Sequence, residues 1–453
     1  MKENKNLNIA IVGAGLTGLT TAYYLKKAGI DVQVFEKADR AGGVINTHHE
    51  NGFTFESGPN TGVLGQPEAT ELLENLKGDC EIEIADVAAK ARWIWKARKW
   101  EALPSGLVGG IKTPLFTFAD KLRLLGEPFR KKGTNPNETL RDLVLRRMGQ
   151  SFLDYAVDPF ILGIYSGDPA KIIPKYALPK LYNLEQDYGS FIGGSIKKAR
   201  QPKTDWEKKA TREIFSVKGG LQNLINALAK NIGEENILLN CESLTFEKIL
   251  YGFQSNKSNE TFSHVISTIG AYALKDTFPF ADAEKIDEIN QLNYAKVVQV
   301  SLGFKKWEGV ELKAFGGLVP HKENRDLLGV LFLSSFLKNK APEGGALLSV
   351  FLGGVRKPKM VELSDDEIKS IVEKEIIEMM GLKYFNPELF QIFRYQHAIP
   401  QYGIESEQKL NAISALEKMN SGLILAGNIR DGIGMADRIK QGKTLATQII
   451  EEK

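Results

Sequence analysis

The stretch Ile9-Ala-Ile-Val-Gly-Ala-Gly-Leu-Thr-Gly18 decides the fold of this chain of 453 residues. Four apolar residues form a strand that enters a turn with glycines in the G-x-G-x-x-G order. Gly13 allows the tight turn, Gly15 lets the backbone approach a pyrophosphate, and Gly18 lets the next helix pack closely on the strand. We expect that helix at Leu16 to Ala28, with its N-terminus facing phosphate charge.

The residues after this turn indicate which dinucleotide binds. A second apolar run, Val32 to Phe35, ends in Glu36, whose carboxylate would accept hydrogen bonds from ribose hydroxyls. A solvated glutamate at a strand end is the alternative, but the position after the second strand favours the ribose contact. Because an acid here disfavours a 2'-phosphate, we expect no NADP-type ligand.

The next residues, Arg40-Ala-Gly-Gly43, favour FAD over NAD, since NAD-binding units do not need them. Arg40 would supply a fixed positive charge for the pyrophosphate. Gly42 and Gly43 would leave backbone amides bare for the same anion or for the ribityl chain. An ordinary turn with a surface arginine is the less favoured interpretation.

A second glycine-rich segment lies near the other end of the chain. Gly422-Leu-Ile-Leu-Ala-Gly-Asn428 predicts a short buried strand and a turn, followed by Gly432-Ile-Gly-Met-Ala-Asp437 and a helix to Ile450. The amide-rich helix start near Gly434 and Met435 would face the pyrimidine edge of a flavin, where negative charge grows on reduction. Alone, this is a plain strand-loop-helix; paired with the first segment, it predicts one FAD spanning both.

The composition is that of a globular protein of more than one domain. Hydrophobic residues make up 43% and charged residues 25% of the chain, and the net charge of +3 does not favour nucleic acid as a partner. The length predicts two or three domains. Only Cys80 and Cys241 occur, without a C-x-x-C motif, so we expect neither a disulfide framework nor a zinc site. His48 and His49 would point to opposite faces of a strand and make a poor metal-binding pair.

The sequence predicts a cytoplasmic protein with no transmembrane helix. Met1 to Asn6 is polar rather than signal-like, and no apolar run approaches the length of about 18 residues that a membrane span needs. The segment Leu103 to Lys132 mixes basic, aromatic and aliphatic residues. Such a helical region can lie on the cytoplasmic face of a membrane, although a helix packed on its own domain is the favoured alternative.

The order of apolar patterns predicts a discontinuous α/β fold: a Rossmann-like FAD domain with two insertions. We assign 1–66, 206–275 and 415–453 to the FAD domain, 67–205 to a mainly helical insertion with membrane-surface contact as a candidate role, and 276–414 to a mixed-sheet substrate domain. Within these ranges we expect a loop-rich Asp158 to Pro179, a strand over Asn236 to Phe246, and a helix over Asp365 to Met380.

Several motifs together resemble the oxygen-dependent protoporphyrinogen oxidases and their coproporphyrinogen III-oxidising relatives, within the flavin-containing amine oxidase superfamily. The nucleotide motifs are shared with amine oxidases and phytoene desaturases, whereas the loop Gly163-Ile-Tyr-Ser-Gly-Asp-Pro169 is more specific. The motifs are the first glycine turn, Arg40-Ala-Gly-Gly43, Glu56-Ser-Gly-Pro-Asn-Thr61, Asp158 to Pro169, Phe315-Gly-Gly-Leu-Val-Pro320 and Ala426 to Ile433.

The resemblance implies oxidation of a porphyrinogen to a porphyrin in haem biosynthesis. Six electrons would leave in three hydride transfers to flavin N5, each followed by reoxidation with dioxygen to hydrogen peroxide. It also makes peripheral membrane contact, a haem-pathway enzyme partner and a homodimer candidate associations. The alternatives are another flavin oxidase or desaturase, of amine oxidase or carotenoid desaturase type, and a non-catalytic FAD-binding membrane adaptor.

The resemblance also implies site residues. The cofactor contacts would be Gly13, Ala14, Gly15, Leu16, Thr17, Gly18, Glu36, Lys37, Arg40, Gly42, Gly43, Gly58, Pro59, Asn60, Ser243, Gly427, Asn428, Gly434, Met435 and Ala436. The substrate contacts would be Asn60, Gly163, Gly167, Phe315, Gly316, Leu318 and Phe351, for which core packing is the alternative role of the large apolar members.

One departure concerns the substrate's propionates. Some relatives carry an arginine where this chain has Asn60, which can hydrogen-bond a carboxylate but adds no charge. Arg92, Arg430 and Lys96 are candidate substitutes, each with a surface role as the alternative. We assign no catalytic acid or base, and His397 is expected to be structural, because hydride transfer depends mainly on alignment.

Overall fold

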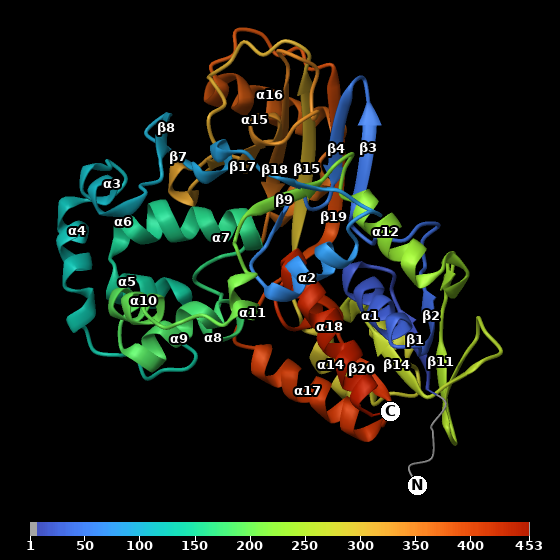
Figure 1. The fold of residues 1–453 in the computed structure, drawn as a ribbon. Helices are drawn as coiled ribbons and strands as arrows, with labels where there is room; N and C mark the ends of the chain where they lie inside the picture. The colour runs from blue at the N-terminus through green and yellow to red at the C-terminus, as the bar shows by residue number, and fades with distance from the viewer. Residues whose placement is uncertain (1–6, 453) are drawn as a thin grey trace.

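The computed structural model describes residues 7–452, so the polar segment Met1 to Asn6 lies outside the described residues, as do the side chains of residues 106–108. Figure 1 shows the arrangement: a nucleotide-binding unit at the lower right, a large sheet at the top, and a group of helices at the left. Within the described range, no helix is both long and apolar enough to cross a membrane.

A five-stranded parallel sheet forms the centre of the nucleotide-binding unit, in the order β10-β2-β1-β14-β20. Alternate side chains of its strands enter two different cores, as the period of two requires. Helices α1, α12 and α18 cover one face, and α14 and α17 share the core on the other. The elements are β1 (Asn8–Val12), α1 (Leu16–Lys27), β2 (Asp31–Phe35), α12 (Gln222–Ile232), β10 (Ile237–Leu238), β14 (His264–Ser267), α14 (Ala283–Asn290), α17 (Ser406–Met419), β20 (Leu423–Leu425) and α18 (Met435–Glu451).

A seven-stranded sheet forms the centre of the second unit. Its strand order is β19-β15-β18-β17-β16-β7-β8. Helix α16 (Asp365–Met380) covers one face, where it packs on Val298, Val300 and Val350. The hairpin of β3 (Asn46–Glu50) and β4 (Phe53–Ser57) lies against the other face. The strands are β7 (Trp93–Lys96), β8 (Lys99–Ala102), β15 (Tyr294–Phe304), β16 (Gly316–Leu318), β17 (Leu327–Phe332), β18 (Ala346–Gly353) and β19 (Leu389–Pro400), with α15 (Leu333–Phe336) before β18.

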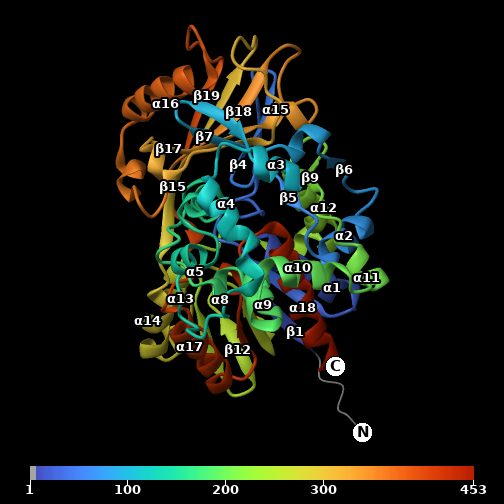
Figure 2. The same cartoon turned by 90° about the vertical axis from the view of Figure 1, so that its left-hand side faces the viewer.

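The helical group stands beside both sheets, and Figure 2 turns it toward the viewer. Its interior contains a buried ionic group: Arg147 pairs with Glu127 and with Glu185, and all three are at most 1% exposed. The helices are α3 (Gly106–Lys112), α4 (Phe118–Leu125), α5 (Leu140–Arg147), α6 (Gln150–Phe152), α7 (Asp158–Tyr165), α8 (Pro174–Ala177), α9 (Pro179–Tyr188), α10 (Phe191–Ala199) and α11 (Asp205–Lys208).

Smaller elements connect these parts. They are a three-stranded sheet of β5 (Gly62–Val63), β9 (Ile214–Val217) and β6 (Ile82–Ile84), another of β11 (Phe246–Ile249), β12 (Gly252–Ser255) and β13 (Thr261–Phe262), and the helices α2 (Pro67–Asn75) and α13 (Leu274–Thr277).

The structure confirms the helix expected over Asp365 to Met380 and corrects two other predictions. The segment Asp158 to Pro179 is not mainly loop, because α7 occupies its first eight residues, with Pro159 at a helix start that tolerates proline. The strand expected over Asn236 to Phe246 is limited to Ile237–Leu238; the chain then turns through Asn240 and Ser243, both with positive φ.

Two packing contacts in the structure join segments that the sequence analysis assigns to different domains. The hairpin β7–β8, inside the range 67–205, pairs with β16 and so extends the seven-stranded sheet. Helices α14 and α17, inside the range 276–414, pack on the nucleotide sheet. We therefore propose to group residues 283–290 and 406–419 with the nucleotide-binding unit.

Candidate functional site

The first glycine turn has the close approaches that its sequence requires. A Cβ atom on Gly18 would lie 2.1 Å from the Gly13 carbonyl oxygen, and one on Gly13 would lie 2.9 Å from Thr268 Oγ1. Gly13 also has φ of 97°, which side-chain-bearing residues rarely adopt. At Gly15, by contrast, the backbone is extended and no atom lies within 4 Å of a Cβ, so this position borders open space. The turn therefore forms a cradle that fits a pyrophosphate.

Glu36 lies directly beside this cradle, at the end of β2. Its two carboxylate oxygens accept hydrogen bonds from the Ala14 N–H, at 2.8 Å, and from the Ala38 N–H, at 3.0 Å. These bonds fix the carboxylate at the turn and leave lone pairs for ribose hydroxyls. The neighbouring Lys37 is exposed.

Arg40 holds its own loop. Its guanidinium donates to the carbonyl oxygens of Ile45, at 2.8 Å, and Gly43, at 2.7 Å. The Gly42 N–H donates to the Ala14 carbonyl at 2.8 Å, which brings the loop against the first turn. The Arg40 guanidinium, which we expected to bind the pyrophosphate, is therefore largely engaged in hydrogen bonds within its own loop.

The C-terminal segment meets the first one at Thr268, which follows β14. The Thr268 hydroxyl limits the space at Gly13. The carbonyl oxygen of Thr268 lies 2.5 Å from a Cβ placed on Gly427. Helix α18 packs on α1 through Gly442, where a Cβ would lie 2.7 Å from the Thr20 Cβ. The two glycine-rich segments are thus side by side, as expected from the sequence.

The remaining expected cofactor contacts lie around these segments. Gly434 precedes α18 and its N–H donates to Asp437, at 3.3 Å, while Met435 and Ala436 begin the helix and are 8% exposed. The Thr17 hydroxyl is buried and makes no hydrogen bond within residues 7–452. Ser243 is exposed, with φ of 54°, beyond the short strand from which it was expected to project.

The segment Gly58-Pro-Asn60 connects the nucleotide-binding unit to the large sheet. The Gly58 N–H donates to Gln299 Oε1 at 3.0 Å, and Asn60 Nδ2 donates to Ser349 Oγ at 3.4 Å. Asn60 is 5% exposed, and its Oδ1 makes no hydrogen bond to any residue in the described range. A buried acceptor without a donor indicates that a ligand group or water completes the site.

Three of the seven expected substrate residues, Gly316, Leu318 and Phe351, share one face of the seven-stranded sheet. Val350 on β18 faces α16, so Phe351 and Ser349 face the opposite way, toward the nucleotide-binding unit. On β16, Leu318 packs on α7, where a Cβ on Gly163 would lie 2.5 Å from Leu318 Cδ2. Gly316 points to the same face as Leu318, two residues away.

The other two expected substrate residues, Gly167 and Phe315, have different surroundings. Gly167 is buried, and a Cβ there would lie 2.6 Å from Gln401 Oε1, so it packs beneath the site rather than lining an open wall. Phe315 directly precedes β16, its ring centroid 4.8 Å from that of Phe336 and 5.4 Å from the Arg92 guanidinium carbon.

One apolar cluster of the helical group contains Tyr165 of α7. Leu318 of β16, Ile399 at the end of β19 and Ile433 of the loop before α18 pack against this cluster. The C-terminal glycine loop, the substrate-facing sheet and the helical group therefore meet at one place. This convergence defines the candidate site for a large apolar substrate.

The three candidate partners for the substrate's propionates differ in whether other groups of the protein already engage their charges. Lys96 donates to the carbonyl oxygens of Pro114, at 2.6 Å, and Leu115, at 3.0 Å, and Arg430 forms an ion pair with Glu417 at 3.0 Å. These two side chains are engaged elsewhere. Arg92 is half-buried and makes no ion pair with any carboxylate in residues 7–452, and burial lowers its pKa.

Sequence reasoning missed Thr268, Gln299 and Tyr402, which connect the glycine segments to the rest of the site. Tyr402 donates to the Asn428 and Gly432 carbonyl oxygens at 3.1 and 3.2 Å. In the sequence, only their position could have marked two of these residues: Thr268 follows an apolar strand, and Tyr402 follows the Ile-Pro-Gln stretch at 399–401.

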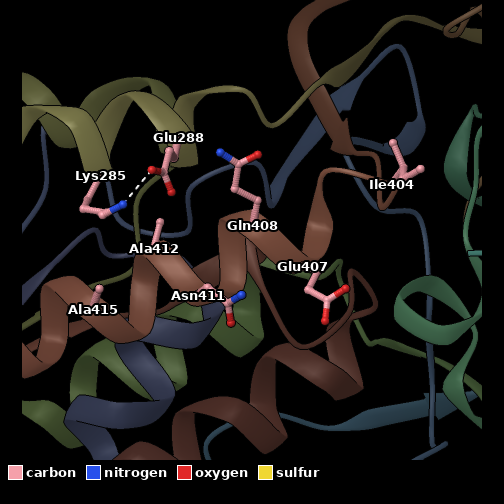
Figure 3. A pocket seen from close by; sticks show the side chains of 8 residues that line it. All are labelled: Lys285, Glu288, Ile404, Glu407, Gln408, Asn411, Ala412 and Ala415. Atoms are coloured by element: carbon pink, nitrogen blue, oxygen red, sulfur yellow. Dashed lines mark hydrogen bonds and ion pairs between the residues drawn. The ribbon is translucent and has the colours of Figure 1, made fainter. Parts of the chain in front are cut away.

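A separate hollow of about 600 Å³ lies between α14 and α17 (Figure 3). Lys285 and Glu288, paired at 2.6 Å, form one rim, and Gln408 and Asn411 project from α17. None of the expected cofactor or substrate residues lines it.

Known proteins with similar sequences and structures identify the family of this chain. The chain is 30% identical to the mitochondrial protoporphyrinogen oxidase of Nicotiana tabacum, over 99% of this chain and 96% of that protein. It is 24% identical to the coproporphyrinogen III oxidase of Bacillus subtilis, over 99% of both. A crystal structure from Exiguobacterium sp. 255-15 that bears the protoporphyrinogen oxidase name superimposes with a TM-score of 0.81 at 22% identity, over 99% of both chains. The family model for flavin containing amine oxidoreductases matches residues 16–450, and this chain therefore belongs to that family.

Proposed function

We propose that this protein binds FAD and oxidises a porphyrinogen, protoporphyrinogen IX or coproporphyrinogen III, to the corresponding porphyrin in haem biosynthesis. The observation that carries the proposal is the convergence of the C-terminal glycine loop, the sheet face bearing Leu318 and Phe351, and α7 at Gly163. The names of the tobacco and Bacillus relatives support the substrate class.

The residues present fit FAD. Gly15 borders open space, the Thr17 hydroxyl has no hydrogen-bond partner in residues 7–452, and Glu36 is held beside the first turn. Bound FAD would accept two electrons at a time from the substrate. The protein's own contribution is orientation: apolar side chains exclude water from a macrocycle and hold it at one distance from the cofactor.

Arg92 and Asn60 are the proposed contacts for the substrate's carboxylates. Arg92 directly precedes β7 and carries a charge without a carboxylate partner in the described residues, beside the ring of Phe315. Asn60 can complement a carboxylate through its Nδ2, and its unpaired Oδ1 can accept from a pyrrole N–H. Charge-assisted hydrogen bonds from Arg92 would give most of the binding energy for the acid group.

Turnover with both porphyrinogens under air tests the proposal. Each molecule oxidised loses six electrons, so three dioxygen molecules become three hydrogen peroxide molecules per porphyrin formed. We expect porphyrin fluorescence and peroxide in that ratio, above the rate of spontaneous oxidation, with at least one of the two substrates. An FAD-loaded protein that accelerates neither oxidation would contradict the proposal, and amine oxidation instead would assign the chain to another branch of the family.

We further propose that α4 contacts the cytoplasmic face of a membrane. Phe118, Leu122 and Leu125 follow the spacing of one helix face and are 76%, 52% and 66% exposed, and Phe129 beyond them is 89% exposed. Lys112, Lys131 and Lys132 flank this apolar face and would attract anionic lipids.

Sedimentation with vesicles tests the membrane contact. Wild-type protein should bind vesicles containing phosphatidylserine more strongly than neutral ones, and the triple variant Phe118→Ser, Leu122→Ser, Leu125→Ser should lose binding while keeping its flavin. Equal binding by the two proteins would exclude this face as the contact. The homodimer and the haem-pathway enzyme partner stay predictions, which size-exclusion chromatography and a two-protein binding assay would test.

A further inference from the structure

Lys409 is a buried cation on helix α17. It lies on the inner side of α17, is 1% exposed, and its ammonium makes no hydrogen bond to any residue between 7 and 452. Burial lowers its pKa to about 8, and Glu405 opposes that shift only in part. A buried charge of this kind destabilises the folded chain, so an apolar residue of the same size would make the protein more stable. Residues that reduce stability in this way are expected at functional sites.

The ammonium of Lys409 lies over the ring of Tyr402. The ammonium nitrogen lies 4.6 Å from the ring centroid, and Tyr402 itself is 4% exposed. A cation over the face of a phenol is attracted by the ring and draws electron density from it, which makes the hydroxyl a stronger hydrogen-bond donor. The charge of Lys409 therefore acts on Tyr402 together with that of Arg438, and through Tyr402 on the groups that its hydroxyl binds.

That hydroxyl binds the loop that precedes α18. It donates to the Asn428 carbonyl, at 3.1 Å, and to the Gly432 carbonyl, at 3.2 Å. Between them, Asp431 has φ of 65° and Gly432 has φ of 93°, so the loop includes a strained left-handed residue that the surroundings must hold. Arg438 and Gln441 support the same loop from α18, through the Arg430 carbonyl and the Asp431 carboxylate.

The direction of these bonds determines where the loop's amides point. In a trans peptide the C=O and N–H groups point opposite ways, so a Gly432 carbonyl turned toward Tyr402 turns the Ile433 N–H away from it. The Ile433 N–H makes no hydrogen bond within the described range, and the Ile433 side chain joins the cluster around Leu318. The free amide therefore belongs to the side of the loop that borders the candidate site.

We propose that Lys409 is a positioning residue for the flavin: through Tyr402 it holds the loop over residues 427–434 with its amides presented to the cofactor. The inference rests on the flavin-binding role of this loop and not on porphyrinogen as the substrate. It predicts that the charge raises both the affinity for FAD and the reduction potential of the bound flavin, because amides that face the pyrimidine edge stabilise the reduced, negatively charged form.

Three variants test this proposal: Lys409→Met, Tyr402→Phe and the double variant. Lys409→Met should raise the melting temperature of the FAD-free protein by about 2–4 °C, because it removes the buried charge. It should also weaken FAD binding about tenfold and move the midpoint potential of saturated protein to a more negative value. Tyr402→Phe should weaken FAD binding similarly, and the double variant should bind no more weakly than either single variant, since both act through one hydroxyl.

Lys175→Met is the matched control, because Lys175 also lies over a tyrosine ring, that of Tyr176 at 5.0 Å, but in the helical group. It should leave FAD affinity and potential unchanged. The proposal is overturned if Lys409→Met binds FAD as tightly as wild type, if its potential is unchanged at saturating FAD, or if the two single effects add. A Lys409→Met protein that is less stable without FAD would assign the lysine a purely structural role. None of these readouts uses a porphyrinogen, so they fail or succeed independently of the assigned substrate.

Discussion

Gly442 in the last helix lies against Thr20 in the first, so close that a Cβ on the glycine would come within 2.7 Å of the threonine Cβ. This contact joins residues more than four hundred positions apart and brings together the helices that follow the two glycine-rich segments. The Thr17 carbonyl lies 2.8 Å from the same point, so there is no room for α18 to accept a side chain here.

Gly442→Ala should therefore destabilise the protein by about 1–3 kcal/mol, the usual cost of overpacking a core. Chemical denaturation would measure the loss. Gly110→Ala, in α3, is the control, since no atom lies within 4 Å of its Cβ and alanine favours helix. Equal stability of Gly442→Ala and wild type would mean that the two helices are not in this contact.

Gly15→Val should abolish flavin retention without unfolding the chain. The backbone at Gly15 is extended, with φ of −74°, which valine adopts easily, and the added side chain enters the open space of the turn. Absorbance of the purified variant near the flavin bands, with circular dichroism as a check on folding, measures the result. Undiminished flavin content would count against a pyrophosphate at this turn.

These two positions illustrate what the sequence could reveal. Glycine spacing and an acid at a strand end are local signals, so the first turn, Glu36 and the C-terminal turn were all predictable. Thr268 and Tyr402 act through contacts between distant segments, and no local pattern marks such contacts. The helix α7 was taken for loop because its Gly163 and Pro159 are poor helix formers, and packing against Leu318 outweighs that preference.

Arg92→Gln should raise KM for the porphyrinogen about tenfold or more, with FAD content unchanged. A charge-assisted hydrogen bond contributes roughly 1.5–3 kcal/mol, and glutamine keeps the polar shape without the charge. Steady-state kinetics measures the change. Arg98→Gln serves for comparison, because Arg98 is a solvent-exposed partner of Glu378, and it should behave as wild type. If both variants lower activity alike, Arg92 has no specific role toward the substrate.

Arg147→Met should destabilise the helical group severely, by about 3–5 kcal/mol, because it leaves Glu127 and Glu185 buried without their cation. Burial would raise the pKa of Glu127, but hydrogen bonds from Ser190 and the Phe191 and Ile192 amides, with the Arg147 charge, outweigh burial and lower it. Urea denaturation and limited proteolysis would report the loss. Lys208→Met breaks an exposed pair with Asp205 and should leave the unfolding curve in place.

The lowered pKa values of Glu127 and Glu185 predict how the stability of the helical group changes in acid. Glu127 and Glu185 both have folded pKa values below their ordinary value of 4.5, so their stabilisation is complete above that pH and is lost as the pH falls through the lower folded values. Wild-type stability should therefore fall on acidification below about pH 4.5. A helical group that resists proteolysis equally at pH 7 and pH 3 would contradict this dependence.

The lowered pKa of Lys409 predicts a second rise of stability with pH, in the alkaline range. Its pKa is about 8 in the folded protein against an ordinary 10.5, so the unfolded chain binds more protons between these values and stability rises with pH across that window. The stability gain of Lys409→Met over wild type should be greatest below pH 8, of order 3 kcal/mol, and should close by about pH 10.5. A gain that does not vary with pH would mean that the pKa of Lys409 is the same in the folded and the unfolded chain.

Anaerobic mixing of the FAD-loaded protein with a porphyrinogen tests the central claim most directly. If this chain is a porphyrinogen oxidase, the yellow flavin absorbance should bleach within the time of a single turnover and return when air is admitted, with porphyrin fluorescence appearing after repeated cycles. Protoporphyrinogen IX and coproporphyrinogen III measured side by side would also show which substrate is preferred. A flavin that stays oxidised with both substrates, in protein that a chemical reductant still bleaches, would contradict the assignment.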